Sequence, residues 1–171
     1  PCPCGYLGHY NQKCRCTPDQ VTRYRSKISG PLLDRIDMVI EVPALKEEEL
    51  MQATVAESST DIRTRVEQAR DIQLQRQGMP NAGLGSLDID THCNTDEAGL
   101  TLLKTAVNRM SLSARAYHRI LKVARTIADL AGSEEIQSAH LAKALHASQS
   151  SEVDDGVNGL IAYGYKFRLV M

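Results

Sequence analysis

The first sixteen residues hold four of the chain's five cysteines, arranged as two pairs that each enclose a single residue. The pairs are Cys2/Cys4 and Cys14/Cys16, with nine residues between them. Zinc is bound tetrahedrally by thiolates, and two tight turns that each present two cysteines could supply all four ligands. A zinc ion held in this way would be a structural staple with no catalytic role.

Two other interpretations of these cysteines stay open: free structural thiols, or pairs that oxidise and reduce readily. Common zinc knuckles enclose about two to four residues within each pair, whereas this chain encloses one. His9, which lies between the pairs, is an alternative ligand. Cys93 is far along the chain, and we expect it to be an ordinary buried or half-buried thiol.

The composition favours a helical protein. Hydrophobic residues make up 42% of the chain, but aromatic residues only 4%, and there is no Trp. A core of Leu, Ile, Val and Ala suits helices better than a β-sandwich. The net charge of −1 gives the whole chain no attraction to nucleic acid or acidic lipid. No apolar run approaches the roughly 18 residues of a membrane span, and the clustered cysteines indicate a reducing, cytoplasmic setting.

A first helix is predicted from the segment Thr17-Pro18-Asp19-Gln20. It combines a capping Thr, a Pro at the first helical position and a Gln three residues after the cap. The helix should run to about Lys27-Ile28, where Ser29-Gly30-Pro31 should end it, because Pro cannot continue the hydrogen-bond ladder. Residues 38–42 are short and β-branched and precede Pro43, so they predict a strand.

Apolar residues recur at helical spacing in five segments after residue 45. The first signal is weak, and the segment around 116–130 is the clearest. The Gly- and Pro-rich segment 78–86 should be a loop and a hinge. From about residue 148 the chain resembles a linker followed by a β-like run. The apolar positions of the helices are Leu50/Ala53/Ala56, Ile62/Val66/Ala69/Ile72, Leu100/Leu103/Ala106/Val107, Ala116/Ile120/Val123/Ile127/Leu130 and Ile136/Leu141/Leu145.

Arg35 lies between two aspartates, after a Gly-Pro turn and just before the predicted strand. One interpretation is a local ion pair with Asp34 or Asp37, worth about 0–1 kcal/mol if it is exposed. The other is an arginine that reaches a phosphate group, for which its planar fork of donors is well suited.

Arg115 falls in the first turn of the clearest predicted helix, two residues after the capping residue Ser113. The helix dipole disfavours a cation there, so the position indicates an anionic ligand shared by Arg115 and the helix N-terminus. The alternative is that Arg115, Arg119 and Lys122 form only the solvated edge of an amphipathic helix.

A basic patch near the N-terminus could contact nucleic-acid phosphates, and Tyr24 within it could stack on a base. The alternative is a solvated helix face. The patch consists of Lys13, Arg15, Arg23, Arg25 and Lys27.

The chain contains no G-x-x-x-x-G-K-S/T loop, no G-x-G-x-x-G motif and no nucleophile elbow, so no stand-alone catalytic site is expected.

The cysteine pairs, the segment 28–37 and the segment 112–130 together resemble the magnesium-chelatase-like AAA+ ATPases, and within them the ComM (YifB) competence-protein branch. The resemblance covers roughly residues 1–147 and implies a C-terminal fragment of a longer protein. The expected fold is mainly α. Residues 1–43 would end an α/β ATPase core and carry the Cys-rich insert, residues 44–147 would form a helical lid bundle, and 148–171 would be a tail outside the resemblance.

The resemblance also implies functional roles. Arg35 is similar to the family's arginine finger, Arg115 resembles its sensor-2 arginine, and the full-length protein would use ATP with Mg²⁺. The family forms hexameric rings, and the ComM branch acts on DNA as a branch-migration helicase in natural transformation. The fragment alone should not hydrolyse ATP. The alternatives are a motor subunit of a metal-chelatase-type complex and a non-enzymatic, zinc-stapled DNA-binding module.

Overall fold

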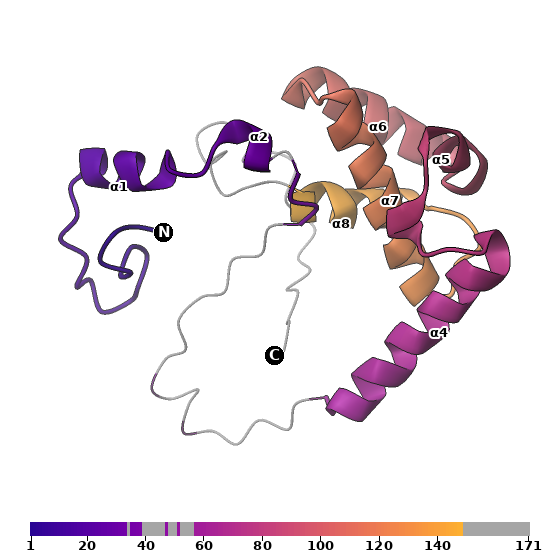
Figure 1. Ribbon diagram of the computed structural model, residues 1–171, viewed down its shortest axis with the longest axis horizontal. Coiled ribbons are helices and arrows are strands. Elements are labelled where there is room, and N and C mark those ends of the chain that lie inside the picture. The colour runs from indigo at the N-terminus through magenta and orange to yellow at the C-terminus, as the bar shows by residue number, and fades with distance from the viewer. Residues whose placement is uncertain (34, 39–46, 48–50, 52–56, 149–171) are drawn as a thin grey trace. The chain divides into compact units, whose positions relative to one another are not determined.

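The computed structural model describes residues 1–33, 35–38, 47, 51 and 57–148, and they divide into two compact units (Figure 1). The N-terminal unit contains Pro1–Ile36, and the helical unit contains Glu57–Ser148. Residues 39–42 of the strand predicted at 38–42, most of the helix predicted around 50–56 and the tail from 149 onward lie outside the described residues.

The described part of the chain is mainly α-helical, which confirms the predicted fold class. Its one β-type contact is a parallel bridge between Thr95 and Ile136. None of the described helices combines the length and apolarity that crossing a membrane would need. The elements are α1 (Pro18–Arg25), α2 (Gly30–Leu33), α4 (Ser59–Gln77), the 3-10 helix η1 (Asn81–Gly83), α5 (Ser86–His92), α6 (Glu97–Met110), α7 (Ala114–Leu130) and α8 (Ser138–Ser148).

In the N-terminal unit, α1 begins as predicted. The Thr17 hydroxyl accepts from the backbone N–H of Gln20, and the Gln20 side chain accepts from the N–H of Thr17, which forms a capping box. Two expectations were wrong. The helix ends at Arg25, and Gly30-Pro31 starts the short helix α2, because Pro fits the first turn of a helix, where its missing N–H has no partner to lose.

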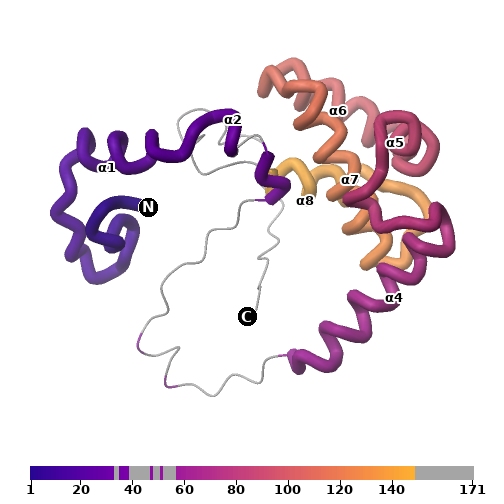
Figure 2. The backbone as a smooth tube through the Cα atoms, in the orientation of Figure 1, coloured from indigo at the N-terminus to yellow at the C-terminus, as the bar shows by residue number. Residues whose placement is uncertain are grey.

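Helix α7 is the centre of the helical unit. It packs against α4, η1, α5 and α8, and α6 packs against α8, so α5–α8 gather in one bundle from which α4 extends (Figure 2). Of the apolar stripe predicted for α7, Ala116 and Ile120 are buried, Val123 and Ile127 are partly buried against the core, and Leu130 is 41% exposed. Ala124 and Ala128, outside the predicted stripe, are fully buried. The other fully buried apolar residues are Ile136, Leu141 and Ala144, from α8 and the turn before it.

A buried ionic network ties these helices together. The Asp129 side chain is 0% exposed and pairs with Arg76 of α4 at 2.6 Å and with Arg125 one turn earlier in α7 at 2.9 Å. Asn81 of η1 donates to the same carboxylate at 2.8 Å. Arg125 also donates to the carbonyl oxygens of Ser133 and Glu134, which closes the turn after α7. Buried charges are tolerated only when they are paired in this way.

The segment 78–86 is an anchored corner, contrary to the predicted hinge. Gly78 ends α4 in the left-handed conformation, with φ of 73°. The N–H of Asn81 donates to the Gln73 side chain at 3.0 Å, and its amide group donates to Thr126 at 3.0 Å. Helix α5 was not predicted from the sequence. It has only seven residues and buries only Ile89, so its apolar residues do not repeat at helical spacing.

The junction before α6 requires a glycine. Asp96 caps α6 by accepting from the N–H of Gly99 at 2.7 Å, and the Thr95 hydroxyl donates to the carbonyl oxygen of Ile136 at 2.8 Å. A Cβ atom at Gly99 would collide with the Thr95 hydroxyl, the Asp96 carboxylate and Leu141. The close approach of α6 to α8 therefore depends on the absent side chain.

We predict that Asp129→Ala lowers the free energy of unfolding of the helical unit by about 3–5 kcal/mol, because it leaves the Arg125 guanidinium buried without its charge partner. Urea or thermal unfolding followed by helical circular dichroism measures this. The matched control is Asp71→Ala, which removes an exposed carboxylate from α4 and should change the stability by less than about 0.5 kcal/mol. Equal stability of the two variants would contradict the network's role.

Stability should also fall in mild acid because of His140. Burial, followed by the charges of Lys143 and Arg125, lowers the pKa of His140 below its ordinary 6.5. The unfolded chain therefore takes up a proton first, and stability that is complete above pH 6.5 is lost as the pH falls through the lower folded pKa. His140→Gln keeps an acceptor for the Gln137 N–H, so its unfolding curve should lack this step. An unchanged pH dependence in that variant would contradict the assignment.

Candidate metal centre and arginine sites

Four cysteine sulfurs converge in the N-terminal unit. The Sγ atoms of Cys2 and Cys4 lie 3.3 Å apart, those of Cys2 and Cys14 lie 3.7 Å apart, and those of Cys4 and Cys14 lie 3.6 Å apart. With Cys16 included, all four lie within 4.8 Å of one another. Tetrahedral zinc with bonds of about 2.3 Å separates its sulfur ligands by about 3.8 Å. The four cysteines therefore fit the ligand set of a tetrahedral zinc ion.

Successive turns bring the second cysteine pair back to the first. The N–H groups of Gly5, His9 and Gln12 donate to the carbonyl oxygens three residues earlier, each at 3.1 Å. Gly5 follows Cys4 with φ of 79°, a conformation that glycine adopts without strain. The chain then passes through Cys14 and Cys16 directly into the capped start of α1, so the helix cap fixes one side of the cluster.

His9 does not belong to the cluster. Its Nδ1 atom accepts from the N–H of Asn11 at 3.2 Å, and its ring packs against Tyr10 with centroids 4.4 Å apart. The alternative in which His9 replaces a thiolate is therefore not supported, and the four cysteines are the candidate ligands.

The N-terminal unit has little else to stabilise it. Among its described residues only Cys2 is buried, and α1 buries none of its side chains. Among the described residues the cysteine cluster is the main candidate to stabilise this unit, and a structural metal ion would do so.

The four thiols differ in acidity. Burial of Cys2 opposes ionisation, but hydrogen bonds from the Cys4 thiol and the Leu7 backbone outweigh it and lower the pKa of Cys2 to about 6. Cys16 accepts a backbone hydrogen bond from Cys4, yet its side-chain interaction with Cys4 and burial raise its pKa to about 12. One thiolate is thus stabilised by its neighbours, and a metal ion would displace the remaining protons.

Cys93 is a separate, buried thiol, as the sequence predicts. Burial raises the pKa of Cys93 to about 11, so it is an inert core residue and not a nucleophile.

Arg35 is exposed and follows α2. Its Nη1 atom donates to the carbonyl oxygen of Pro31 at 2.6 Å, and its N–H donates to that of Leu32 at 3.0 Å. The first contact holds a terminal nitrogen of the guanidinium against α2, and the second is a backbone hydrogen bond. Asp34, one of the two predicted ion-pair partners, lies outside the described residues.

Arg115 occupies the second position of α7, where it is exposed, while Ala116 and Ile120 of the same helix are buried. The Ser113 hydroxyl caps the helix as predicted, accepting from the N–H of Ala116 at 3.1 Å. On the basic edge of α7, the Lys122 ammonium donates to the carbonyl oxygen of Ala82 at 3.2 Å.

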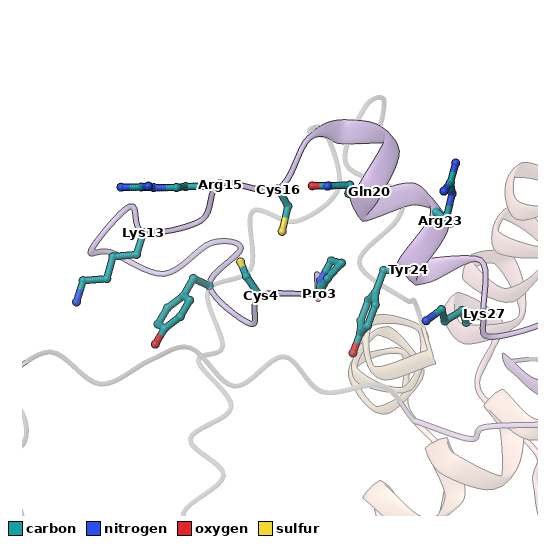
Figure 3. Close-up of a pocket in the computed structure, with 10 residues that line it drawn as sticks. Pro3, Cys4, Lys13, Arg15, Cys16, Gln20, Arg23, Tyr24 and Lys27 are labelled. Carbon is teal, nitrogen blue, oxygen red and sulfur yellow. The ribbon is translucent and has the colours of Figure 1, made fainter.

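The predicted basic patch lines an open hollow of about 690 Å³ beside the cysteines (Figure 3). The hollow's lining residues are Pro3, Cys4, Tyr6, Lys13, Arg15, Cys16, Gln20, Arg23, Tyr24 and Lys27; Arg25 of the predicted patch is not among them.

The buried ionic network of the helical unit was not predicted from the sequence. The available signal was that Arg125 and Asp129 lie four residues apart within an apolar stripe.

Comparison with known proteins assigns both parts of the chain. Residues 1–50 match the family model of magnesium chelatase, subunit ChlI, and residues 56–147 match that of magnesium chelatase, subunit ChlI C-terminal. Competence protein ComM of Haemophilus influenzae is 45% identical over 147 residues, which cover 85% of this chain and 28% of ComM. The uncharacterised protein YifB of Escherichia coli is 41% identical over 148 residues, which also cover 85% of this chain and 28% of YifB.

An uncharacterised protein of Mycobacterium bovis is 36% identical over 136 residues, covering 77% of this chain and 26% of that protein. The chain therefore belongs to the ChlI-type magnesium-chelatase family and, within it, to the ComM/YifB group. It spans less than a third of the length of these relatives.

We predict about one zinc ion per chain in protein purified without chelator, measured by elemental analysis. Cys2→Ser should abolish this zinc, because Cys2 is the buried ligand around which the other sulfurs gather. Cys93→Ala is the control: it removes a thiol outside the cluster and should leave the zinc content unchanged. Metal-free wild-type protein, or equal zinc content in the two variants, would refute the four-cysteine zinc site.

Proposed function

We propose that this chain is the C-terminal part of a ring-forming AAA+ ATPase that acts on DNA. The observation that carries the proposal is the match to ChlI-type family models over residues 1–50 and 56–147, combined with 45% identity to a competence protein. Residues 1–43 would end the ATPase core, and residues 44–147 would form its lid. The ATP-dependent parent would be a cytoplasmic hexamer that drives DNA branch migration.

In this proposal Arg35 is an arginine finger. Its guanidinium would reach the γ-phosphate of ATP bound to the neighbouring subunit and stabilise the charge that develops during phosphoryl transfer. Its exposure supports this role, and Nη1 would exchange its bond to the Pro31 carbonyl oxygen for the phosphate.

Arg115 is the proposed sensor-2 residue, which would contact nucleotide in its own subunit. The first turn of a helix attracts anions, and Arg115 adds a forked donor to that turn. The rest of α7 is immobilised by Asp129 and by its buried apolar stripe, so the position of Arg115 would report lid closure over the nucleotide.

Bound ATP with Mg²⁺ would supply the phosphoryl group that is transferred to water. The chain holds no G-x-x-x-x-G-K-S/T loop, so another part of the parent protein would bind the phosphates. What this chain would contribute is positive charge: one arginine directed at a neighbouring subunit and one directed at the subunit's own nucleotide. Zinc on the four cysteines would fix the N-terminal unit without taking part in the reaction.

A motor subunit for metal insertion into a porphyrin is the rival function, because both family models carry the magnesium-chelatase description. Identity of 45% to a competence protein, extending over 147 residues of this chain, favours DNA as the substrate. Stimulation of ATP hydrolysis by DNA would separate the two functions.

The test is steady-state ATP hydrolysis by the full-length parent protein, with and without branched DNA. We expect DNA to stimulate the rate and Arg35→Ala to lower kcat by about 10³-fold or more, as loss of an arginine finger does. Arg115→Ala should weaken ATP use as well. Arg63→Ala removes an exposed cation from α4 and serves as the control. A rate that is indifferent to both DNA and Arg35→Ala would contradict the proposal.

A further inference from the structure

The hollow beside the cysteine cluster has the composition of a nucleic-acid site. Four of its ten lining residues are cations, and none of the ten, all within the described N-terminal segment, is acidic. Residues 1–33 carry five Lys/Arg against one Asp, although the whole chain has a net charge of −1. The positive charge is therefore concentrated locally, which is how a protein of near-neutral charge can still attract a polyanion.

The cations lie on two sides of the thiols. In Figure 3 the Cys4 and Cys16 sulfurs point toward one another, Lys13 and Arg15 lie on the turn side, and Lys27 lies on the helix side. All four basic lining residues are exposed, so phosphates can reach them. The thiols join the segment of Pro3, Cys4 and Tyr6 to the segment 13–27 that carries all four cations, so the lining of the hollow depends on the cluster that zinc would hold.

Exposed aromatic rings accompany the charges. Tyr24 is 39% exposed and Tyr6 is 43% exposed, and both line the hollow. The Lys27 ammonium lies 5.6 Å from the centre of the Tyr24 ring, so a cation and an aromatic face are held together. In one nucleotide the phosphate would bind the cation and the base would stack on the ring. A base can stack on tyrosine only when it is not already stacked within a duplex.

We infer that this hollow binds single-stranded DNA, with Lys13, Arg15, Arg23 and Lys27 on the phosphates and Tyr24 stacked on a base. The inference rests on the proposed DNA function and adds the surface that performs it. Charges and ring faces carry no base-edge readout, so binding is independent of sequence. It also depends on the metal, because zinc would hold Pro3, Cys4 and Tyr6 of the hollow against the segment 13–27 that carries the four cations.

The experiment measures fluorescence anisotropy of a labelled, mixed-sequence single-stranded oligonucleotide with the zinc-loaded full-length parent. One variant changes Lys13, Arg15, Arg23 and Lys27 to Ala. Its control changes four exposed cations of the helical unit to Ala: Arg63, Arg70, Lys104 and Arg109. Zinc content, measured for each variant, shows that the N-terminal unit is still folded.

The wild-type affinity should fall about fiftyfold for a fourfold rise in salt if all four cations contact phosphates, at a slope of about 0.7 per contact. The first variant should lose most of both the affinity and the salt dependence, and the control should retain them. Tyr24→Leu should bind roughly tenfold more weakly with an unchanged salt slope. Chelation of zinc should weaken binding of the wild type.

Each contrary result has a distinct meaning. If the first variant binds the oligonucleotide as the control does, and DNA still stimulates its ATP hydrolysis, the hollow is not the DNA site, although the proposed function stands. If the wild type neither binds DNA nor responds to it, the proposed function fails too. Binding of the hollow to anionic lipid vesicles, but not to the oligonucleotide, would also overturn the inference.

Discussion

The helical unit depends on the buried carboxylate of Asp129. Its partners come from three elements: Arg76 from α4, Asn81 from η1 and Arg125 from α7 itself. Taking each of these ions out of water costs several kcal/mol, so the arrangement is stable only when every partner is in place. The carboxylate thereby favours one packing of α4 on α7. Arg125 also fixes the turn that leads to α8, by donating to two of its carbonyl oxygens.

The N-terminal unit is built on a different principle. It has almost no buried apolar surface among its described residues, and the convergent sulfurs of its four cysteines take the place of a core. The same sulfurs join the segment of Pro3, Cys4 and Tyr6 to the segment 13–27, which carries the cations of the hollow. Stability and the proposed DNA contact would then depend on one metal ion, whereas the proposed nucleotide contact of Arg115 depends on an ionic network.

Several signals that depend on neighbours in sequence were interpreted correctly. The capping box at Thr17, the Ser113 cap and the buried positions Ala116 and Ile120 of α7 were predictable, because each involves residues within a few turns of one another. The short helix α5 was missed, since one buried side chain gives no period, and Pro31 starts a helix where a stop was predicted. The segment 78–86 looked like a hinge because its anchors, Thr126 and Asp129, are more than forty residues away.

The sequence by itself determined the helical fold class, the family resemblance and the four candidate metal ligands, because cap residues, apolar periodicity and cysteine spacing are local properties of the chain. Only the tertiary structure decided which charges are buried. Arg125 and Asp129 resemble surface residues in the sequence, yet both are buried by helices that arrive from distant segments. It also decided that His9 stays outside the cluster and that lysines and tyrosines meet beside it, because such convergence depends on where turns direct the chain in space.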